Sequence, residues 1–181
     1  MKGTYMNSRI PLGKTEATIG SMLKKRATEY SRNIVLKERK SDGEYFGLRW
    51  VDFYARIRGI GSTLLAGGVK KGDRVAVYSR NSEDMLIWEL AVMSVGAISV
   101  PIFAGYFPPQ LDYILSHSEA KIILLSDAVQ CEKLLQTEAQ HALEKIVLVQ
   151  DAEKYADDPR VCAFDDLLES ADSSAFEKAT M

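Results

Sequence analysis

Hydrophobic residues in the middle of the chain alternate between short strand-like runs and longer helix-like segments. A β-branched run over residues 74–78 follows the turn pair Gly72-Asp73, and a nearly continuous apolar segment follows over residues 85–95. Further strand-like runs lie at residues 97–103, 121–125 and 145–149. A strand, a crossover helix and another strand within so few residues require parallel pairing. The pattern therefore predicts a mainly parallel sheet.

Capping residues mark where the crossover helices begin. Residues 79–82 (Ser-Arg-Asn-Ser) can cap the first one, and Glu83 and Asp84 place negative charge at its positive end. Pro108-Pro109 suits the first turn of the second helix, because proline lacks an amide donor that would be unpaired there anyway. A third helix is predicted after Ser126 or Asp127, with its apolar positions at Val129, Leu134 and Leu135.

The N-terminal part predicts a helix, a hairpin and a second helix. Thr15 or Thr18 can cap the first helix, and Asp42-Gly43 lies between strand-like runs at 34–38 and 45–48, which predicts a hairpin at one edge of the sheet. The second helix begins at Trp50. Arg49 stands where a capping box needs a hydroxyl to pair with Asp52, at an expected cost of about 1 kcal/mol.

The predicted fold class is α/β: a three-layer sandwich with a mainly parallel sheet, helices on both faces and an N-terminal β-hairpin. We divide the chain into a flexible arm at residues 1–14, an α/β subdomain at 15–150 and an acidic C-terminal segment at 151–181. The last segment contains nine Asp or Glu residues and three Lys or Arg residues. It is expected to be too polar to extend the core far.

Composition restricts the class of protein. With 46% hydrophobic residues, 27% charged residues and a formal net charge of -2, the chain is typical of soluble globular proteins and gives no sign of a nucleic-acid surface. Glu89, Gly96 and Pro101 interrupt the most apolar window, so we predict no membrane span. Cys131 and Cys162 lack metal-site spacing and lie in helix-like surroundings, which favours a reduced, cytoplasmic setting.

Candidate chemistry is sparse. The two histidines, His117 and His141, lie near predicted helix ends, without a carboxylate and a nucleophile at recognisable spacing. The sequence therefore assigns no catalytic residue and no metal ligand. In parallel sheets ligands bind past the carboxyl ends of the strands, here in the loops at 79–82 and 104–107. The candidate cleft-lining residues are Ser79, Arg80, Asn81, Tyr106 and Phe107. The alternative, that both loops only cap helices and pack, stays open.

Three segments resemble a known family. The first resemblance is to the early core motif of the adenylate-forming (AMP-binding) superfamily, and it lies at residues 90–102, with 108–110 and 113–115 downstream. This superfamily includes acyl-CoA synthetases, peptide synthetase adenylation domains and luciferases. Residues 48–53 resemble a second early motif, except that Arg49 replaces its Ser or Thr. Residues 78–82 and 100–103 are most similar to long-chain fatty acyl-CoA synthetases. The resemblance extends over residues 18–150.

This resemblance implies an activity for a longer protein. Such a ligase uses ATP, Mg²⁺ and coenzyme A to convert a fatty acid, through an acyl-adenylate, into acyl-CoA, AMP and pyrophosphate. The family's Ser/Thr/Gly-rich phosphate loop with its lysine has no counterpart here. The chain is therefore expected to be an inactive N-terminal fragment that binds no cofactor tightly.

The implied partners are the remaining subdomains of the same polypeptide, with self-association through the surface that those subdomains would cover. The implied location is the cytoplasm, with the full-length enzyme at a membrane periphery. Two other functions stay open: a free-standing flavodoxin-like module that binds a nucleotide or flavin, and a non-catalytic interaction domain.

Overall fold

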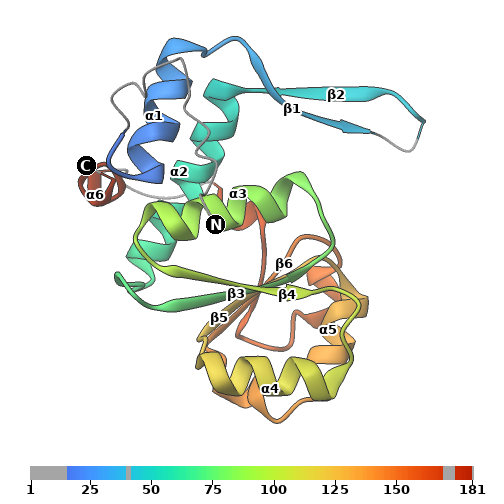
Figure 1. The fold of residues 1–181 in the computed structure, drawn as a ribbon. Coiled ribbons are helices and arrows are strands. Elements are labelled where there is room, and N and C mark those ends of the chain that lie inside the picture. Colours follow the sequence, from blue (N-terminus) through green and yellow to red (C-terminus); the bar gives the residue numbers. More distant parts are fainter. Residues whose placement is uncertain (1–15, 40–41, 169–173, 181) are drawn as a thin grey trace, which may run out of the picture.

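The protein has three layers, with a five-stranded parallel sheet between two layers of helices (Figure 1). The structure is a computed structural model that describes residues 16–39, 42–168 and 174–180. The predicted arm at 1–14, the alternative cap Thr15 and part of the hairpin turn lie outside these residues. All neighbouring strands of the sheet pair in parallel, which confirms the predicted fold class.

The strand order of the sheet is β4-β3-β5-β6-β7. Counted along the chain, this is the order 2-1-3-4-5 of flavodoxin-like folds, in which the direction of winding reverses between the first and third strands. That switch point lies between β3 and β5. The strands are β3 (Arg74–Ser79), β4 (Ile98–Phe103), β5 (Ile122–Leu125), β6 (Lys145–Leu148) and β7 (Val161–Ala163).

Strand β3 supplies residues to both hydrophobic cores. Val75 and Val77 pack in a cluster with α1, α2 and α3, whereas Ala76 and Tyr78 pack in a second cluster with α4 and α5. Because successive side chains of a strand point to opposite faces, one buried strand anchors both helical layers. The helices are α1 (Ile19–Glu29), α2 (Trp50–Ala66), α3 (Glu83–Ser94), α4 (Pro108–Ser118) and α5 (Ala128–Leu134).

The predicted helix starts are confirmed where side chains cap them. Thr18 caps α1, Ser82 caps α3 by accepting from the Met85 amide, and Asp127 caps α5. Arg49 makes no side-chain cap for α2. Its guanidinium instead donates to the Asp52 carboxylate at 2.7 Å, in an exposed ion pair. Half of the capping box is therefore missing, as predicted.

The hairpin forms, but its predicted place at the edge of the sheet is wrong. Strands β1 (Ile34–Arg39) and β2 (Tyr45–Arg49) make a separate two-stranded antiparallel sheet that projects from the upper helical layer (Figure 1). Leu48 is buried in the cluster beside α2, which holds the base of the hairpin against the helices. Strands β4 and β7 lie at the two ends of the larger sheet.

The segment after residue 150 adds more to the core than its polar composition predicts. It contains the fifth strand, β7, and three hydrophobic residues that are at most 5% exposed: Phe164, Leu167 and Phe176. Cys162 lies on β7, so its predicted helix-like surroundings are wrong. The division at residue 150 itself stays a prediction. The short elements of the C-terminal half are η1 (Ala139–Ala142), η2 (Ala152–Tyr155), η3 (Asp165–Leu167) and α6 (Ser174–Ala179).

Of the three apolar positions predicted along helix α5, only Leu134 is buried in the core. Val129 and Leu135 are 56% and 43% exposed, while Gln130, Cys131 and Leu134 are buried. The buried positions follow helical spacing, but hydrophobicity alone does not indicate Gln130 as part of the buried face. Among the described residues, no helix is long and apolar enough to cross a membrane.

We predict that the Phe176→Ala variant loses about 3–5 kcal/mol of unfolding free energy. The Phe176 ring is fully buried and fills the space beside Gly61, where a Cβ would lie 2.3 Å from the ring. Urea denaturation measures the loss. The matched Phe103→Ala variant removes a ring that is 70% exposed and should change stability by less than about 1 kcal/mol. Equal losses in the two variants would show that α6 does not belong to the core.

Candidate functional site

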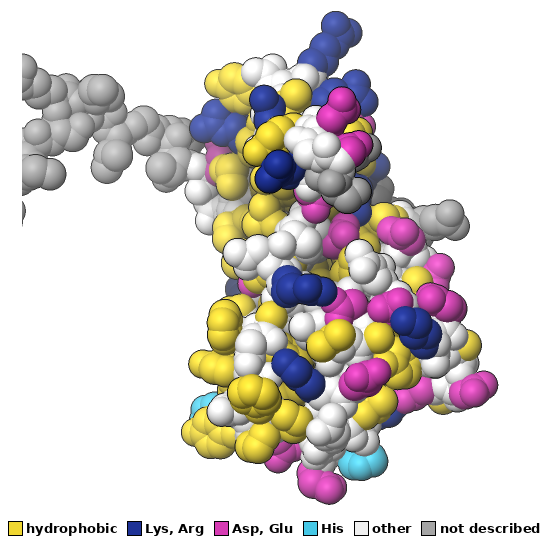
Figure 2. All heavy atoms as spheres, turned by 90° about the vertical axis from the view of Figure 1, so that its right-hand side faces the viewer, with side chains coloured by type: hydrophobic (Ala, Val, Ile, Leu, Met, Phe, Trp, Pro, Cys, Tyr) yellow, Lys and Arg dark blue, Asp and Glu magenta, His cyan; other side chains and the backbone are white. Residues whose placement is uncertain are grey.

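Two adjoining hollows lie where the parallel strands end, on the side of the molecule that faces the viewer in Figure 2. The larger has a volume of about 590 Å³ and the smaller of about 360 Å³. Both are lined by Arg80, Phe103 and Ala104. The larger is also lined by Ser79, Asn81, Met85, Pro101 and Ile102, and the smaller by Gly105, Val129 and Gln130.

An ion pair joins the loops on the two sides of the switch point. The Arg80 guanidinium, in the loop after β3, contacts the carboxylate of Asp127, in the loop after β5. The other Asp127 oxygen accepts from the Val129 amide at 2.9 Å and so caps α5. The Asp127 side chain is 7% exposed, whereas that of Arg80 is 70% exposed. The Arg80 guanidinium is thus held by the Asp127 carboxylate, while the Arg80 side chain remains largely exposed to solvent.

A buried tyrosine fixes the loop after β4. The Tyr78 hydroxyl donates to the Tyr106 carbonyl at 2.6 Å, and burial raises the pKa of Tyr78. The Phe103 ring packs edge to face against the Tyr106 ring, with centroids 5.6 Å apart. The ammonium of Lys133 lies 5.6 Å from the centroid of the Phe107 ring. One contact between two aromatic rings and one contact between an ammonium and an aromatic ring therefore hold this loop beside the hollows.

The predicted cleft residues divide into two groups. Ser79, Arg80 and Asn81 line the same hollow. Tyr106 and Phe107 line neither hollow. They lie in the loop after β4 and are 38% and 64% exposed.

Phe103 and Asp127 are two of the site residues that the sequence did not single out. Phe103 is the last residue of β4 and lines both hollows, so its position at a strand end was the available signal. Asp127 was identified only as a cap, and no sequence signal links it to Arg80, 47 residues away.

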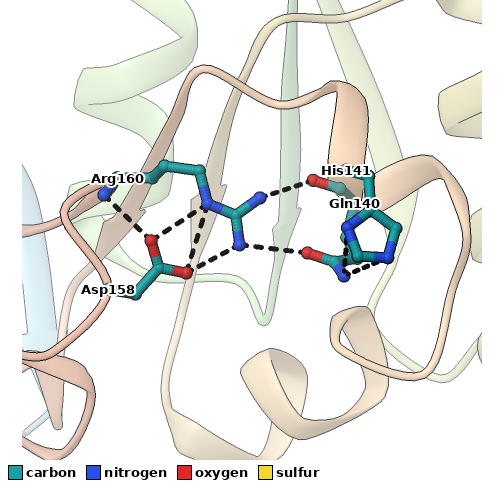
Figure 3. A network of polar contacts seen from close by, with 4 residues as sticks. All are labelled: Gln140, His141, Asp158 and Arg160. Carbon is teal, nitrogen blue, oxygen red and sulfur yellow. Dashed lines mark hydrogen bonds and ion pairs between the residues drawn. The ribbon is translucent and has the colours of Figure 1, made fainter.

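A second polar cluster lies away from the hollows and is structural (Figure 3). The Arg160 guanidinium donates to the Asp158 carboxylate, and also to the backbone carbonyl and the side-chain oxygen of Gln140. The hydrogen bonds from Arg160 lower the pKa of Asp158. His141 contacts Gln140 but not Asp158 in this cluster. The cluster ties η1 to the turn before β7 and contains no nucleophile.

The remaining reactive groups offer no nucleophile or metal centre. Burial raises the pKa of Cys131 to about 11 and also raises the pKa of Cys162, so both thiols stay protonated at neutral pH. The His117 ring stacks on Tyr113, with centroids 5.9 Å apart. Within residues 16–39, 42–168 and 174–180, no group of three or more His, Cys, Asp or Glu could hold a metal ion. The lining of the hollows is mostly apolar, with the charge of Arg80 and the amides of Asn81 and Gln130 as its main polar groups, and it contains no acid–base pair.

Comparison with known proteins identifies the family. The model of the AMP-binding enzyme family matches residues 23–175, which is most of the chain. The chain belongs to the AMP-binding enzyme family. This confirms the resemblance that the early motifs indicate.

The relatives of this AMP-binding chain are much longer proteins. Fatty acyl-CoA synthetase A of Dictyostelium discoideum is 28% identical over 103 residues, which is 55% of this chain and 15% of the relative. Long-chain-fatty-acid–CoA ligase FadD15 of Mycobacterium bovis is 30% identical over 89 residues, or 49% of this chain and 15% of the relative. The chain thus spans about 15% of the length of these curated relatives.

A solved structure confirms the fold of the AMP-binding chain. The crystal structure of Brucella canis acyl-CoA synthetase superposes with a TM-score of 0.74 and 18% identity, and covers 87% of this chain and 28% of that one. At this identity the likeness concerns the fold alone.

We predict that Asp127→Ala costs about 1–2 kcal/mol of unfolding free energy, because it removes the α5 cap and the partner of Arg80. Asp127→Asn should cost less than about 1 kcal/mol, since an amide oxygen still accepts from the Val129 amide and the Arg80 side chain, 70% exposed, remains solvated without its partner. Urea denaturation of both variants measures the difference. Equal losses would mean that the ion pair, not the cap, is what Asp127 provides.

We predict a pH-dependent role for Asp158. Its pKa lies below the ordinary 3.8, so its ionised form stabilises the folded state above that pH, and this stabilisation is lost as the pH falls through the lowered pKa. Asp158→Asn should reduce the unfolding free energy at pH 7 by about 1 kcal/mol, and the difference from wild type should shrink at pH values below 3.8.

The control for Asp158 is the exposed Asp165, whose Asn variant should match wild type across the same pH series of chemical denaturation. A difference between wild type and Asp158→Asn that stays constant down to acid pH would contradict the assignment.

Proposed function

We propose that this chain is the N-terminal portion of an AMP-forming acid–CoA ligase. The observation that carries the proposal is the family match over residues 23–175, together with a largely apolar hollow at the carboxyl end of the sheet that also bears Arg80 and Asn81. The proposed reaction of the whole protein joins a fatty acid to coenzyme A at the expense of ATP, with Mg²⁺, and releases AMP and pyrophosphate through an acyl-adenylate. The names of the relatives support a fatty-acid substrate.

The hollow is proposed as one wall of the ligand cleft. Arg80 supplies a positive charge, and Asn81 an exposed amide. The Ser79 hydroxyl donates to the Arg80 carbonyl at 2.9 Å, which braces the loop that bears the charge. Phe103 adds an apolar side at the mouth. Tyr106 and Phe107 are proposed to contact ligand or neighbouring chain from the flank. None of these residues is assigned to a bond-making step.

The partners proposed for this chain are further subdomains of the same polypeptide. Along the outer strand β4, Ile98 and Phe103 are 51% and 70% exposed, and Met93 of the adjacent helix is 37% exposed. Apolar surface of this kind is typical of an interface, so the chain alone is expected to self-associate. We further propose a cytoplasmic protein that reaches the membrane only at its periphery.

A flavodoxin-like binding module is the second candidate function. The strand order 2-1-3-4-5 favours it, because such folds bind a ligand at the switch point. In this chain the ion pair of Arg80 and Asp127 lies at that point, which leaves less room for a flat ring system. A visible absorption band of flavin in the purified chain would favour the module, whereas a colourless chain favours the ligase.

We predict that the 181-residue chain shows no fatty-acid-dependent release of pyrophosphate, while the protein made from the whole natural reading frame does. In that protein, Arg80→Ala should lower kcat/KM about tenfold, which corresponds to one lost charge-assisted contact of about 1.4 kcal/mol. Lys121→Ala, at an exposed ion pair with Glu144 beside the amino end of β5, is the control and should leave kcat/KM unchanged.

Fatty-acid-dependent release of pyrophosphate by the purified 181-residue chain would contradict the prediction that this chain is inactive. Absence of acid-dependent pyrophosphate release from the whole protein would contradict the ligase.

A further inference from the structure

One face of the β1–β2 hairpin combines positive charge with apolar side chains. Arg39 lies opposite Tyr45, and Lys37 lies opposite Gly47. Because alternate residues of a strand share a face, these residues and Arg49 lie on the same side of the hairpin. The Ile34 side chain covers Gly47 on that side, 2.7 Å from where a Cβ would stand. We call Ile34, Lys37, Arg39, Tyr45 and Arg49 the ribbon face.

The ribbon face points away from the body of the protein. On the opposite side of the hairpin, Leu36 and Leu48 lie across from each other, and both pack against the cluster that contains α2. Glu38 shares that opposite side, and its charge helps raise the pKa of Glu83 at the start of α3, after the larger effect of burial. The side bearing the cations is therefore the outer one.

The charges of the ribbon face are available. Lys37 and Arg39 are exposed and form no ion pair within the part of the chain that the structure describes. Arg49 pairs only with the exposed Asp52. Tyr45 is 67% exposed and Ile34 is 53% exposed. By register, the five side chains of the ribbon face include no carboxylate.

The whole molecule is polarised in charge. Residues 1–66 contain 13 Lys or Arg and six Asp or Glu, whereas residues 67–181 contain 10 Lys or Arg and 19 Asp or Glu. Figure 2 shows many Lys and Arg side chains over the upper part, where the hairpin projects in Figure 1, with some Asp and Glu among them, while the lower part bears charges of both signs. Such asymmetry is typical of proteins that meet an anionic surface with one end.

We propose that the ribbon face docks on an anionic lipid surface. Lys37, Arg39 and Arg49 would meet headgroup phosphates, while the amphipathic ring of Tyr45 and the side chain of Ile34 would enter the interfacial layer. The acidic lower part would then face away from the lipid. Salt would screen the repulsion between its carboxylates and the anionic headgroups at that distance. A nucleic acid fits less well, because the exposed Ile34 has no role in phosphate binding. This inference does not rest on the proposed ligase activity.

The test is sedimentation of the 181-residue chain with vesicles. We expect binding to equimolar phosphatidylcholine and phosphatidylglycerol at low salt, no binding to phosphatidylcholine alone, and release at high salt. The double variant Lys37→Gln, Arg39→Gln should reduce the partition coefficient about 30-fold, because each cation near the surface contributes about fivefold. The matched control, Lys70→Gln with Lys71→Gln, removes the same charge outside the hairpin and should bind like wild type.

Three results would overturn the proposal. They are wild-type binding by the hairpin variant, equal binding to neutral vesicles, and binding to a single-stranded oligonucleotide without binding to vesicles. A far-ultraviolet circular dichroism spectrum identical to wild type shows that the hairpin variant is folded. If the hairpin variant is not folded, the salt dependence of wild-type binding tests the proposal instead. Binding of the wild-type chain that persists at high salt would contradict docking through charge.

Discussion

The burial of strand β3 on both faces is the constraint on which the rest of the structure depends. Its residues Val75, Ala76, Val77 and Tyr78 are each at most 1% exposed, and the strand pairs with β4 on one side and β5 on the other. Val75 and Val77 hold the α2–α3 layer, while Ala76 and Tyr78 hold the α4–α5 layer. A polar side chain in place of Val75, Ala76 or Val77 would bury a polar group in a core, whereas the Tyr78 hydroxyl is paired with the Tyr106 carbonyl.

The same strand determines where the hollows lie. Because β3 ends at Ser79, the first residues released from the sheet are those that line the larger hollow. Two long-range contacts then fix the neighbouring loops: Arg80 holds the loop after β5 through Asp127, and Tyr78 holds the loop after β4 through the Tyr106 carbonyl. The site therefore combines three loops that are far apart in sequence, and these two contacts hold them together.

Local signals explain what the sequence could predict. The caps Thr18 and Ser82, the Asp42-Gly43 turn and the apolar runs depend on near neighbours, and the parallel sheet follows from the alternation of strands and helices. Strand β7 has only three residues in a polar segment, so its place depends on pairing with β6. The burial of Phe176 depends on Gly61, which is distant in sequence and offers a gap that no pattern reveals.

The chain belongs to the AMP-binding enzyme family, and one measurement most directly tests the proposal that it is part of a longer acid-activating ligase. The natural coding sequence can be read past the codon for Met181. The account predicts that the frame continues and encodes a Ser/Thr/Gly-rich loop followed by a lysine, the feature that would hold the ATP phosphates. A stop codon directly after Met181 would contradict the account, since the protein would then have the family's fold without its phosphate-binding loop.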